Sequence, residues 1–273
     1  MKEKKKQKGR AGAVGFCQSC GQEHNLPAAP AEKAAFQLMK TLETADRIDF
    51  VVPVQQADPR CSLAYLRGPA RGKMFGVLLA QASVGKSVHL YAFSGQYNGL
   101  WQVPGWVDPV FDLHAFHQIH DEEERVIKQL TRQIDRLPSD ARERQERQEL
   151  VRLRKEKSRL LMRKIHSLYR LRNFQGRIAG LEKIFSSNKG IPTGTGDCCA
   201  PKLLQQAALH GLTPLGLAEF YLGRENASGT RQHGCFYPSC RTKCYPILGF
   251  MLCGIESSEK SEKSEKEYGE VRL

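Results

Sequence analysis

A long, strongly charged helical segment from Asp112 to about Phe185 is the feature that most constrains how this chain can fold. Its apolar residues recur at the 3-4-3 spacing by which one helix packs against another. Pro138 breaks the pattern, and Ser139 and Asp140 provide an N-terminal cap for a second helix. The spacing therefore predicts an antiparallel helical hairpin. Its expected buried residues are Ile127, Leu130, Ile134 and Leu137 in the first helix and Leu150, Leu153, Leu161, Ile165 and Leu168 in the second.

The chain is basic, and this hairpin carries much of the charge. The sequence has 42 Lys and Arg against 29 Asp and Glu, a formal net charge of +13. Such an excess attracts polyanions, and it also suits a solvated coiled-coil face with no fixed partner. On the first interpretation, RNA is the partner, and its phosphates are neutralised by the second helix. The predicted contact residues are Arg152, Arg154, Lys155, Lys157, Arg159, Arg163 and Lys164.

Apolar patterns on both sides of the hairpin predict an α+β core. A continuous apolar run is typical of a buried strand, and alternation of apolar and polar residues is typical of a half-buried strand. Apolar residues that recur every three to four positions are typical of a helix. We therefore expect a small sheet of three to four strands with helices, interrupted by the long basic antiparallel hairpin. The expected strands are Met74 to Gln81, Val88 to Phe93 and Pro214 to Leu222, and the expected helices are Ala31 to Thr44, Ala200 to His210 and Pro238 to Leu252.

The chain divides into five segments by composition. We expect the basic stretch from Met1 to about Phe16 and the Ser-Glu-Lys repeats at the end to be disordered, because neither can bury apolar surface. The predicted segments are a basic arm with a Cys-x2-Cys knuckle at 1–30, the first half of the core at 31–111, the helical hairpin at 112–189, the second half of the core at 190–256 and the tail at 257–273.

The sequence predicts a cytoplasmic protein with no membrane partner. The lysine-rich start lacks the apolar segment of a secretory signal, and the apolar stretch from Ile247 to Ile255 is too short to span a bilayer. Nine cysteines in such a chain indicate reduced thiols or metal ligands rather than a disulfide framework.

The first metal-ligand pattern is Cys17-x2-Cys20, half of a common zinc site. His24 lies close enough along the chain to be a third ligand, and Cys61 is the nearest candidate for the fourth. Zinc is therefore a predicted cofactor here. The alternative is an exposed dithiol on a flexible arm.

A second cysteine-bearing stretch resembles a known family. Gly194 to Leu204 reads GTGDCCAPKLL, which is similar to a G-x-G-[ED]-C-x-A-P-K-L-L segment upstream of the catalytic domain in long RluA-type RNA pseudouridine synthases. The likeness covers roughly Phe50 to Gly254 in the same order. Its other parts are Gly72 to Val77, Ala92 to Gly95, Leu217 to Phe220, Phe236 to Pro238 with Cys240, Lys243 and Cys244, and Pro246 to Leu248.

This resemblance implies an RNA-associated accessory module linked to pseudouridine modification. The family's catalytic motif, Arg-Leu-Asp followed by Thr-Ser-Gly, is absent from the chain. Pseudouridine formation by this chain alone is therefore not expected, and the reaction would need a separate synthase catalytic subunit as partner. The chain would then be the accessory region as a protein of its own, or the product of a truncated gene.

Two alternatives remain open. The order strand, strand, helix, strand, helix resembles zinc deaminases, with Cys198 or Cys199, Cys240 and Cys244 around a metal at two helix N-termini. Deaminases carry a proton-transferring Glu two residues after the first ligand, where this chain has Ala or Pro. Glu219 is a possible substitute that the sequence does not place. The third hypothesis is a coiled-coil adaptor that binds another protein, and on that view the cysteines are small buried side chains.

Overall fold

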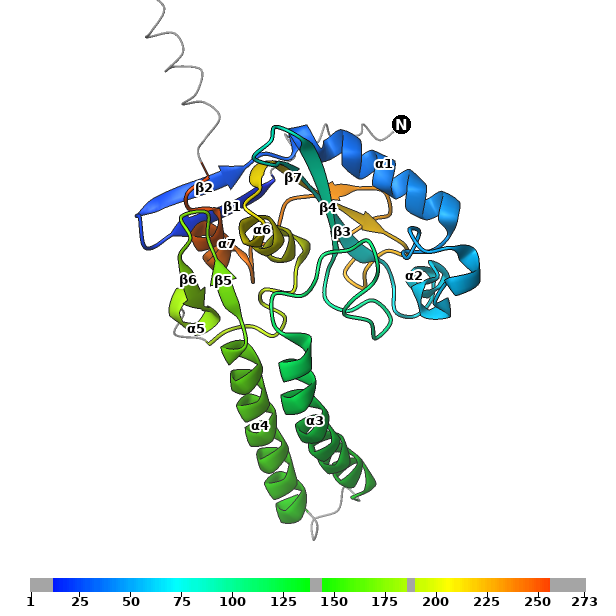
Figure 1. Ribbon diagram of the computed structural model, residues 1–273. Coiled ribbons are helices and arrows are strands. Elements are labelled where there is room, and N and C mark those ends of the chain that lie inside the picture. The colour runs from blue at the N-terminus through cyan, green and yellow to red at the C-terminus, as the bar shows by residue number, and fades with distance from the viewer. Residues whose placement is uncertain (1–11, 138–143, 186–189, 256–273) are drawn as a thin grey trace, which may run out of the picture.

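The computed structural model describes residues 12–137, 144–185 and 190–255. Its centre is an antiparallel sheet in the order β4-β3-β7-β8 (Figure 1). The strands β3 (Lys73–Gln81) and β4 (Ser87–Phe93) precede the helical hairpin, and β7 (Thr213–Leu222) and β8 (Phe236–Tyr237) follow it. Both sides of the hairpin thus contribute to one sheet, which confirms the predicted α+β class with a small sheet.

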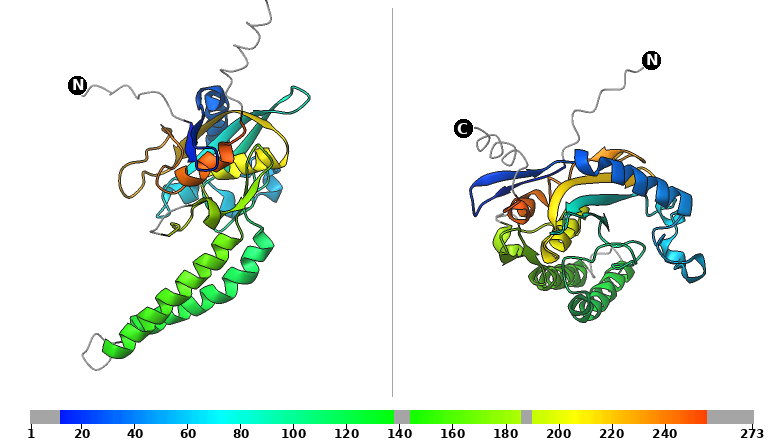
Figure 2. Two further views of the ribbon diagram at one scale, coloured as in Figure 1. Left: turned by 90° about the vertical axis from the view of Figure 1, so that its left-hand side faces the viewer. Right: turned by 45° about the horizontal axis from the view of Figure 1, so that its top comes forward.

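Both faces of the sheet are covered, which explains the uninterrupted apolar run in β3. The helix α1 (Ala29–Ala45) lies along one face and α6 (Cys199–Leu209) along the other (Figure 2). Along β3, Phe75 and Val77 join the α1 side of the core, whereas Leu78 and Ala80 join the α6 side. The predicted helices and strands in this part agree with the observed ones to within two residues.

The helical hairpin projects from the core as two neighbouring helices, α3 (Leu113–Arg136) and α4 (Arg144–Ser167) (Figures 1 and 2). Asp112 caps α3 by accepting a hydrogen bond from the Ala115 amide at 2.7 Å. The predicted break and cap at residues 138–140 lie outside the described residues. Of the predicted stripe, Leu130, Ile134, Leu161 and Ile165 are buried.

Two parts of the hairpin prediction were wrong. Leu153 is 42 % exposed, because it lies eight residues before Leu161 and therefore about 80° around the helix from the buried side. The helical segment also ends at Ser167 rather than near Phe185. The chain continues as a small hairpin of β5 (Arg170–Arg172) and β6 (Ile178–Gly180) and the short helix α5 (Leu181–Ile184).

The N-terminal knuckle is a β-hairpin of β1 (Ala13–Cys17) and β2 (Gln22–Leu26) that packs on α7 (Tyr245–Leu252). The predicted disorder up to Phe16 is therefore wrong for β1, whose residues pair with β2. The predicted start of α7 at Pro238 is also wrong. The preceding residues form β8 and a turn, and Pro246 instead lies in the first turn of the helix, where proline is tolerated.

The remaining described elements are short, and they lie between α1 and β3. They are the 3-10 turns at Val54–Gln56 and Pro59–Cys61 and the helix α2 (Ala64–Arg67).

Within the described ranges, no helix is both long and apolar enough to cross a membrane.

The contact between β1 and α7 requires glycine on both sides. A Cβ atom added to Gly249 would lie 2.1 Å from the carbonyl oxygen of Phe16, and one added to Gly15 would lie 2.1 Å from the amide nitrogen of Gly249. No side chain fits between backbones that approach so closely.

We therefore predict that Gly249→Ala destabilises the protein by about 1–3 kcal/mol, because the added methyl group would force β1 and α7 apart. Inside a helix, replacement of glycine by alanine usually stabilises the protein instead. Urea unfolding measures the difference. Gly68→Ala is the control, since its Cβ would meet atoms only at 3.6 Å or more. Equal stabilities of the two variants would contradict the packing described here.

Candidate metal centres and a basic helical face

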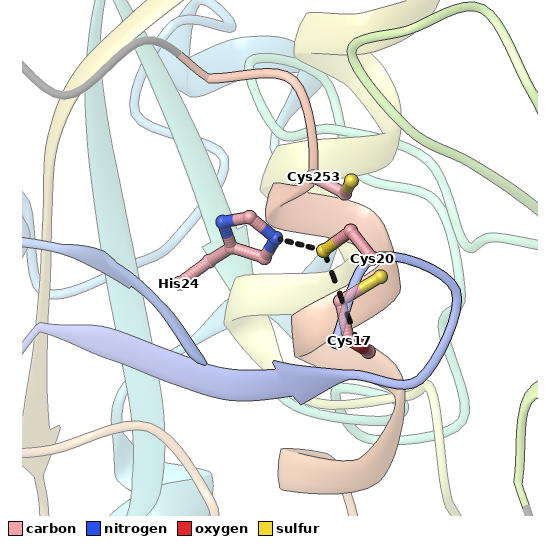
Figure 3. Close-up of side chains that lie close together, drawn as sticks. All are labelled: Cys17, Cys20, His24 and Cys253. Carbon is pink, nitrogen blue, oxygen red and sulfur yellow. Dashed lines mark hydrogen bonds between the residues drawn. The ribbon is translucent and has the colours of Figure 1, made fainter. Parts of the chain in front are cut away.

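The first cluster of metal-ligating side chains joins the two ends of the described chain. Cys17 ends β1, Cys20 lies in the following turn, His24 lies on β2 and Cys253 caps the C-terminus of α7. Their ligand atoms all lie within 4.8 Å of one another (Figure 3). The four residues, here called the knuckle site, could hold a metal ion.

The geometry of the knuckle site suits a closed tetrahedral centre. The Cys20 Sγ atom lies 3.1 Å from His24 Nε2, and the tight turn is closed by a hydrogen bond from the Gly21 amide to the Cys17 carbonyl. Burial lowers the pKa of His24, which favours the neutral ring that a metal requires. Burial raises the pKa of Cys253 to about 12, so this thiol needs a cation beside it to ionise. Four protein ligands are typical of a structural metal site.

The prediction of Cys61 as the fourth ligand is not supported, because Cys253 occupies that position. Cys61 is buried on the other face of the sheet, in the cluster that contains Leu63 and Tyr97. Sequence spacing offers no signal for Cys253, since its proximity depends on the packing of α7 against β1.

The second cluster consists of Cys198, Cys240 and Cys244, whose sulfur atoms lie within 4.8 Å of one another. Cys198 is the N-cap of α6 and Cys244 is the N-cap of α7, while Cys240 lies in the turn before α7. The predicted meeting of two helix N-termini at these cysteines is therefore observed. The partial positive charge at a helix N-terminus stabilises a thiolate that lies beside it. These three residues, here called the helix-start site, could also hold a metal ion.

Cys199, predicted as an alternative ligand, is not part of the helix-start site. Its thiol points to the carbonyl oxygen of Met74 on β3, with the sulfur 3.4 Å away, and its side chain is fully buried. Cys199 therefore packs α6 against the sheet, while the adjacent Cys198 faces the other two sulfurs.

The three thiols of the helix-start site are electrostatically coupled. Hydrogen bonds from Cys198 and Cys244 hold the pKa of Cys240 well below its ordinary value. The hydrogen bonds with Cys240 and Cys244 raise the pKa of Cys198. One shared thiolate is thus favoured without a metal, whereas metal binding requires all three to be deprotonated.

A buried carboxylate lies beside the helix-start site. Glu219 on β7 is 5 % exposed, and its Oε1 atom accepts hydrogen bonds from the Ala200 amide at 3.2 Å and the Ser239 hydroxyl at 3.0 Å. Burial raises the pKa of Glu219 to about 7. Ala200 stands two residues after Cys198, where deaminases carry their Glu. A carboxylate supplied by the neighbouring strand therefore reaches the start of α6.

The segment around Cys198 is also anchored to the core by charged groups. The Lys202 ammonium donates to the carbonyl oxygens of Phe93 at 3.0 Å and Gly95 at 2.8 Å. Tyr169 donates its hydroxyl to Asp197. These contacts explain why a Lys and an Asp occur in a helix start that is otherwise apolar, and they fix the direction of Cys198.

The predicted RNA-binding residues divide into two groups on α4. Arg152, Lys155, Arg159 and Arg163 are exposed and lie at intervals of three and four residues, so they form one stripe, here called the basic stripe. Their side chains make no hydrogen bond or ion pair with any described residue. The other three are less available. Arg154 and Lys157 are half-buried, and Lys164 pairs with Glu123 of α3 at 2.6 Å.

No protein-family model, curated protein or solved structure matches this chain. The resemblance to the accessory region of RluA-type synthases therefore stays a prediction. The function has to be inferred from the two cysteine clusters and the basic stripe.

We predict that Cys253→Ser removes one metal equivalent per chain and lowers the unfolding temperature, because it takes one of four ligands from the knuckle site. Metal content of purified protein and thermal unfolding measure both effects. Cys61→Ser is a matched control, since it alters an equally buried thiol that contacts neither cluster. Loss of metal from both variants, or from neither, would contradict the assignment of Cys253.

Proposed function

We propose that this protein is a cytoplasmic, RNA-associated accessory module that binds RNA phosphates through the basic stripe of α4. The observation that carries the proposal is the alignment of Arg152, Lys155, Arg159 and Arg163 on one side of a helix that projects from the core. Contacts of this kind are independent of base sequence and sensitive to salt.

The position of the basic stripe supports a polyanionic partner. From Arg152 to Arg163 the helix rises about 16 Å, a length that brings several phosphates within reach. The buried residues Leu161 and Ile165 lie on the opposite side of α4, so packing against α3 leaves the stripe accessible. A stripe of four cations at helical spacing is suited to following a phosphate backbone.

The distribution of charge between the two helices supports the same partner. Within its bounds α4 has nine Lys and Arg against three Glu, whereas α3 has four Lys and Arg against five Asp and Glu. A merely solvated helix pair would tend to alternate the sign of its charges along both helices. The excess positive charge is instead concentrated on α4.

We further propose that zinc occupies both cysteine clusters, since thiolate and imidazole are ligands that zinc prefers. In the knuckle site it would be structural, joining the β1–β2 hairpin to α7. The resemblance of Gly194 to Leu204 to the RluA-type accessory region supports a role beside a pseudouridine synthase. Modification chemistry would then come from that catalytic partner.

We expect reversal of the basic stripe to Glu at all four positions to weaken RNA binding by at least about tenfold. The negative slope of log affinity against log salt should become shallower by roughly three, because each lost phosphate contact on a single strand removes about 0.7 from its magnitude. Fluorescence anisotropy with a labelled single-stranded RNA over a salt series measures both quantities.

The control for this experiment reverses the same number of charges on α3, at Arg125, Lys128, Arg132 and Arg136, which are also exposed. The α3 variant should lose much less affinity, although its net charge is identical. Equal losses would show that only net charge matters. Unchanged binding in the α4 variant would exclude the stripe and favour the hypothesis of an adaptor that binds another protein.

A second candidate function, zinc-dependent deamination of a nucleobase, is favoured by one observation. The helix-start site offers three thiolate ligands, as catalytic zinc sites do, with the carboxylate of Glu219 hydrogen-bonded at the start of α6. In this reaction water replaces the exocyclic amino group of the base, which leaves as ammonia.

On the deaminase hypothesis, zinc-loaded protein releases ammonia from cytidine, adenosine or a single-stranded RNA. The variant Cys240→Ser should lose one zinc and at least about 100-fold of that rate, since the metal activates the water. Cys235→Ser, which removes a thiol outside both clusters, should retain zinc and rate. Absence of ammonia from all three substrates would exclude deamination and leave the RNA-binding proposal standing.

A further inference from the structure

We infer that a metal ion in the helix-start site keeps its fourth coordination position for a water molecule, and that Glu219 is the hydrogen-bond and proton acceptor for this water. The inference deepens the second candidate function and shares its premise, a metal at Cys198, Cys240 and Cys244. It concerns coordination rather than turnover, so each can fail without the other.

The ligand count leaves one position of a tetrahedral ion unfilled. Among the described residues, Cys198, Cys240 and Cys244 are the His, Cys, Asp or Glu side chains whose ligand atoms converge at this place. The nearest other candidates are already engaged. Asp197 accepts the hydroxyl of Tyr169, and the Cys199 thiol faces the carbonyl of Met74.

Solvent can supply the missing ligand. Cys198 and Cys240 are both partly exposed, and only Cys244 is buried. The knuckle site differs in having four protein ligands of its own. A half-exposed centre with three protein ligands retains water in its fourth position, which is the arrangement of catalytic rather than structural zinc.

Glu219 is oriented by hydrogen bonds to groups that adjoin the metal ligands. Its Oε1 atom is fixed by two donors that adjoin two of the ligands, the Ser239 hydroxyl next to Cys240 and the Ala200 amide two residues after Cys198. Its Oε2 atom has no hydrogen-bond partner among the described residues. The carboxylate is thus oriented by one oxygen, and the other remains for the water.

The sheet is adapted to this arrangement at Gly76, which pairs with Glu219 across β3 and β7. A Cβ atom at Gly76 would lie 2.7 Å from the Cβ of Cys199 and 3.5 Å from the Cγ of Glu219. Glycine at this position therefore lets the start of α6 approach the strand that carries the carboxylate.

The chemical step is a proton transfer that balances without another reactant. With a metal held by the three cysteines, the Glu219 carboxylate would accept a proton from the bound water, and the hydroxide left on the metal would be a nucleophile. Such a nucleophile adds to an electron-poor carbon, of which the amino-bearing carbon of a nucleobase is an example. The carboxylic acid formed on Glu219 can then protonate the departing nitrogen.

Cobalt substitution tests the open position directly. The protein is loaded with Co²⁺, whose visible spectrum reports its ligands, and imidazole is added as the exchangeable probe. We expect imidazole to change the wild-type spectrum by displacing the water. This response should disappear in Cys240→Ser, which assigns it to the helix-start site. A wild-type spectrum that imidazole does not change would overturn the inference.

The role of Glu219 is tested by Glu219→Gln, which preserves the shape of the side chain. Without the carboxylate the water loses a charged hydrogen bond, so imidazole should bind about tenfold more tightly. Glu122→Gln, on the exposed surface of α3, should bind imidazole as the wild type does. Equal affinity in the wild type and Glu219→Gln would exclude Glu219 as the acceptor.

A second variant covers the case in which Glu219→Gln does not fold. Ser239→Ala removes one of the two donors that orient the carboxylate, while the carboxylate remains. It should tighten imidazole binding by a smaller factor of about three, and no change would count against the proposed orientation. A positive imidazole result without ammonia release would confirm the open site and exclude deamination alone.

Discussion

The burial of α6 and α7 against the sheet in one apolar cluster brings two helix N-termini together at three cysteine sulfurs. Helix starts carry partial positive charge and amides without a partner in their own helix, and at α6 the Ala200 amide donates to Glu219. Cys198 and Cys244, as the N-caps, place their sulfurs at this point, and Cys240 adds the third. Apolar packing thus joins two helices that are distant in the sequence and leaves the three sulfurs at one place.

Much of the fold could be predicted from local patterns. The continuous apolar run of β3 requires burial on both faces, and the 3-4-3 spacing around Leu130 and Ile134 requires a helical partner. The Cys17-x2-Cys20 pair predicts a compact knuckle, although not the two strands that flank it. Each of these signals acts within a few residues, so no knowledge of the rest of the chain is needed.

The candidate sites could be predicted only in part, because their remaining members come together through tertiary packing. Cys253 meets Cys20 because α7 lies against β1 at two glycines, a contact with no local signature. Cys198 and Cys199 are neighbours in the sequence, and only the direction of α6 separates the ligand from the packing residue. Likewise, Glu219 adjoins Ala200 because β7 runs beside the start of α6. The local sequence motif therefore lacks a carboxylate, but the fold places one next to it.

The helix α7 connects the two metal-ligand clusters. It is eight residues long, and a helix of that length is too short to be stable in water by itself. Cys244 at its start belongs to one cluster and Cys253 at its end to the other. Burial of six of its residues holds α7 in place, and an ion bound at either end would add to this and keep the ligand at the opposite end in position. Two such centres would share one helix, so that filling of the first would raise the affinity of the second.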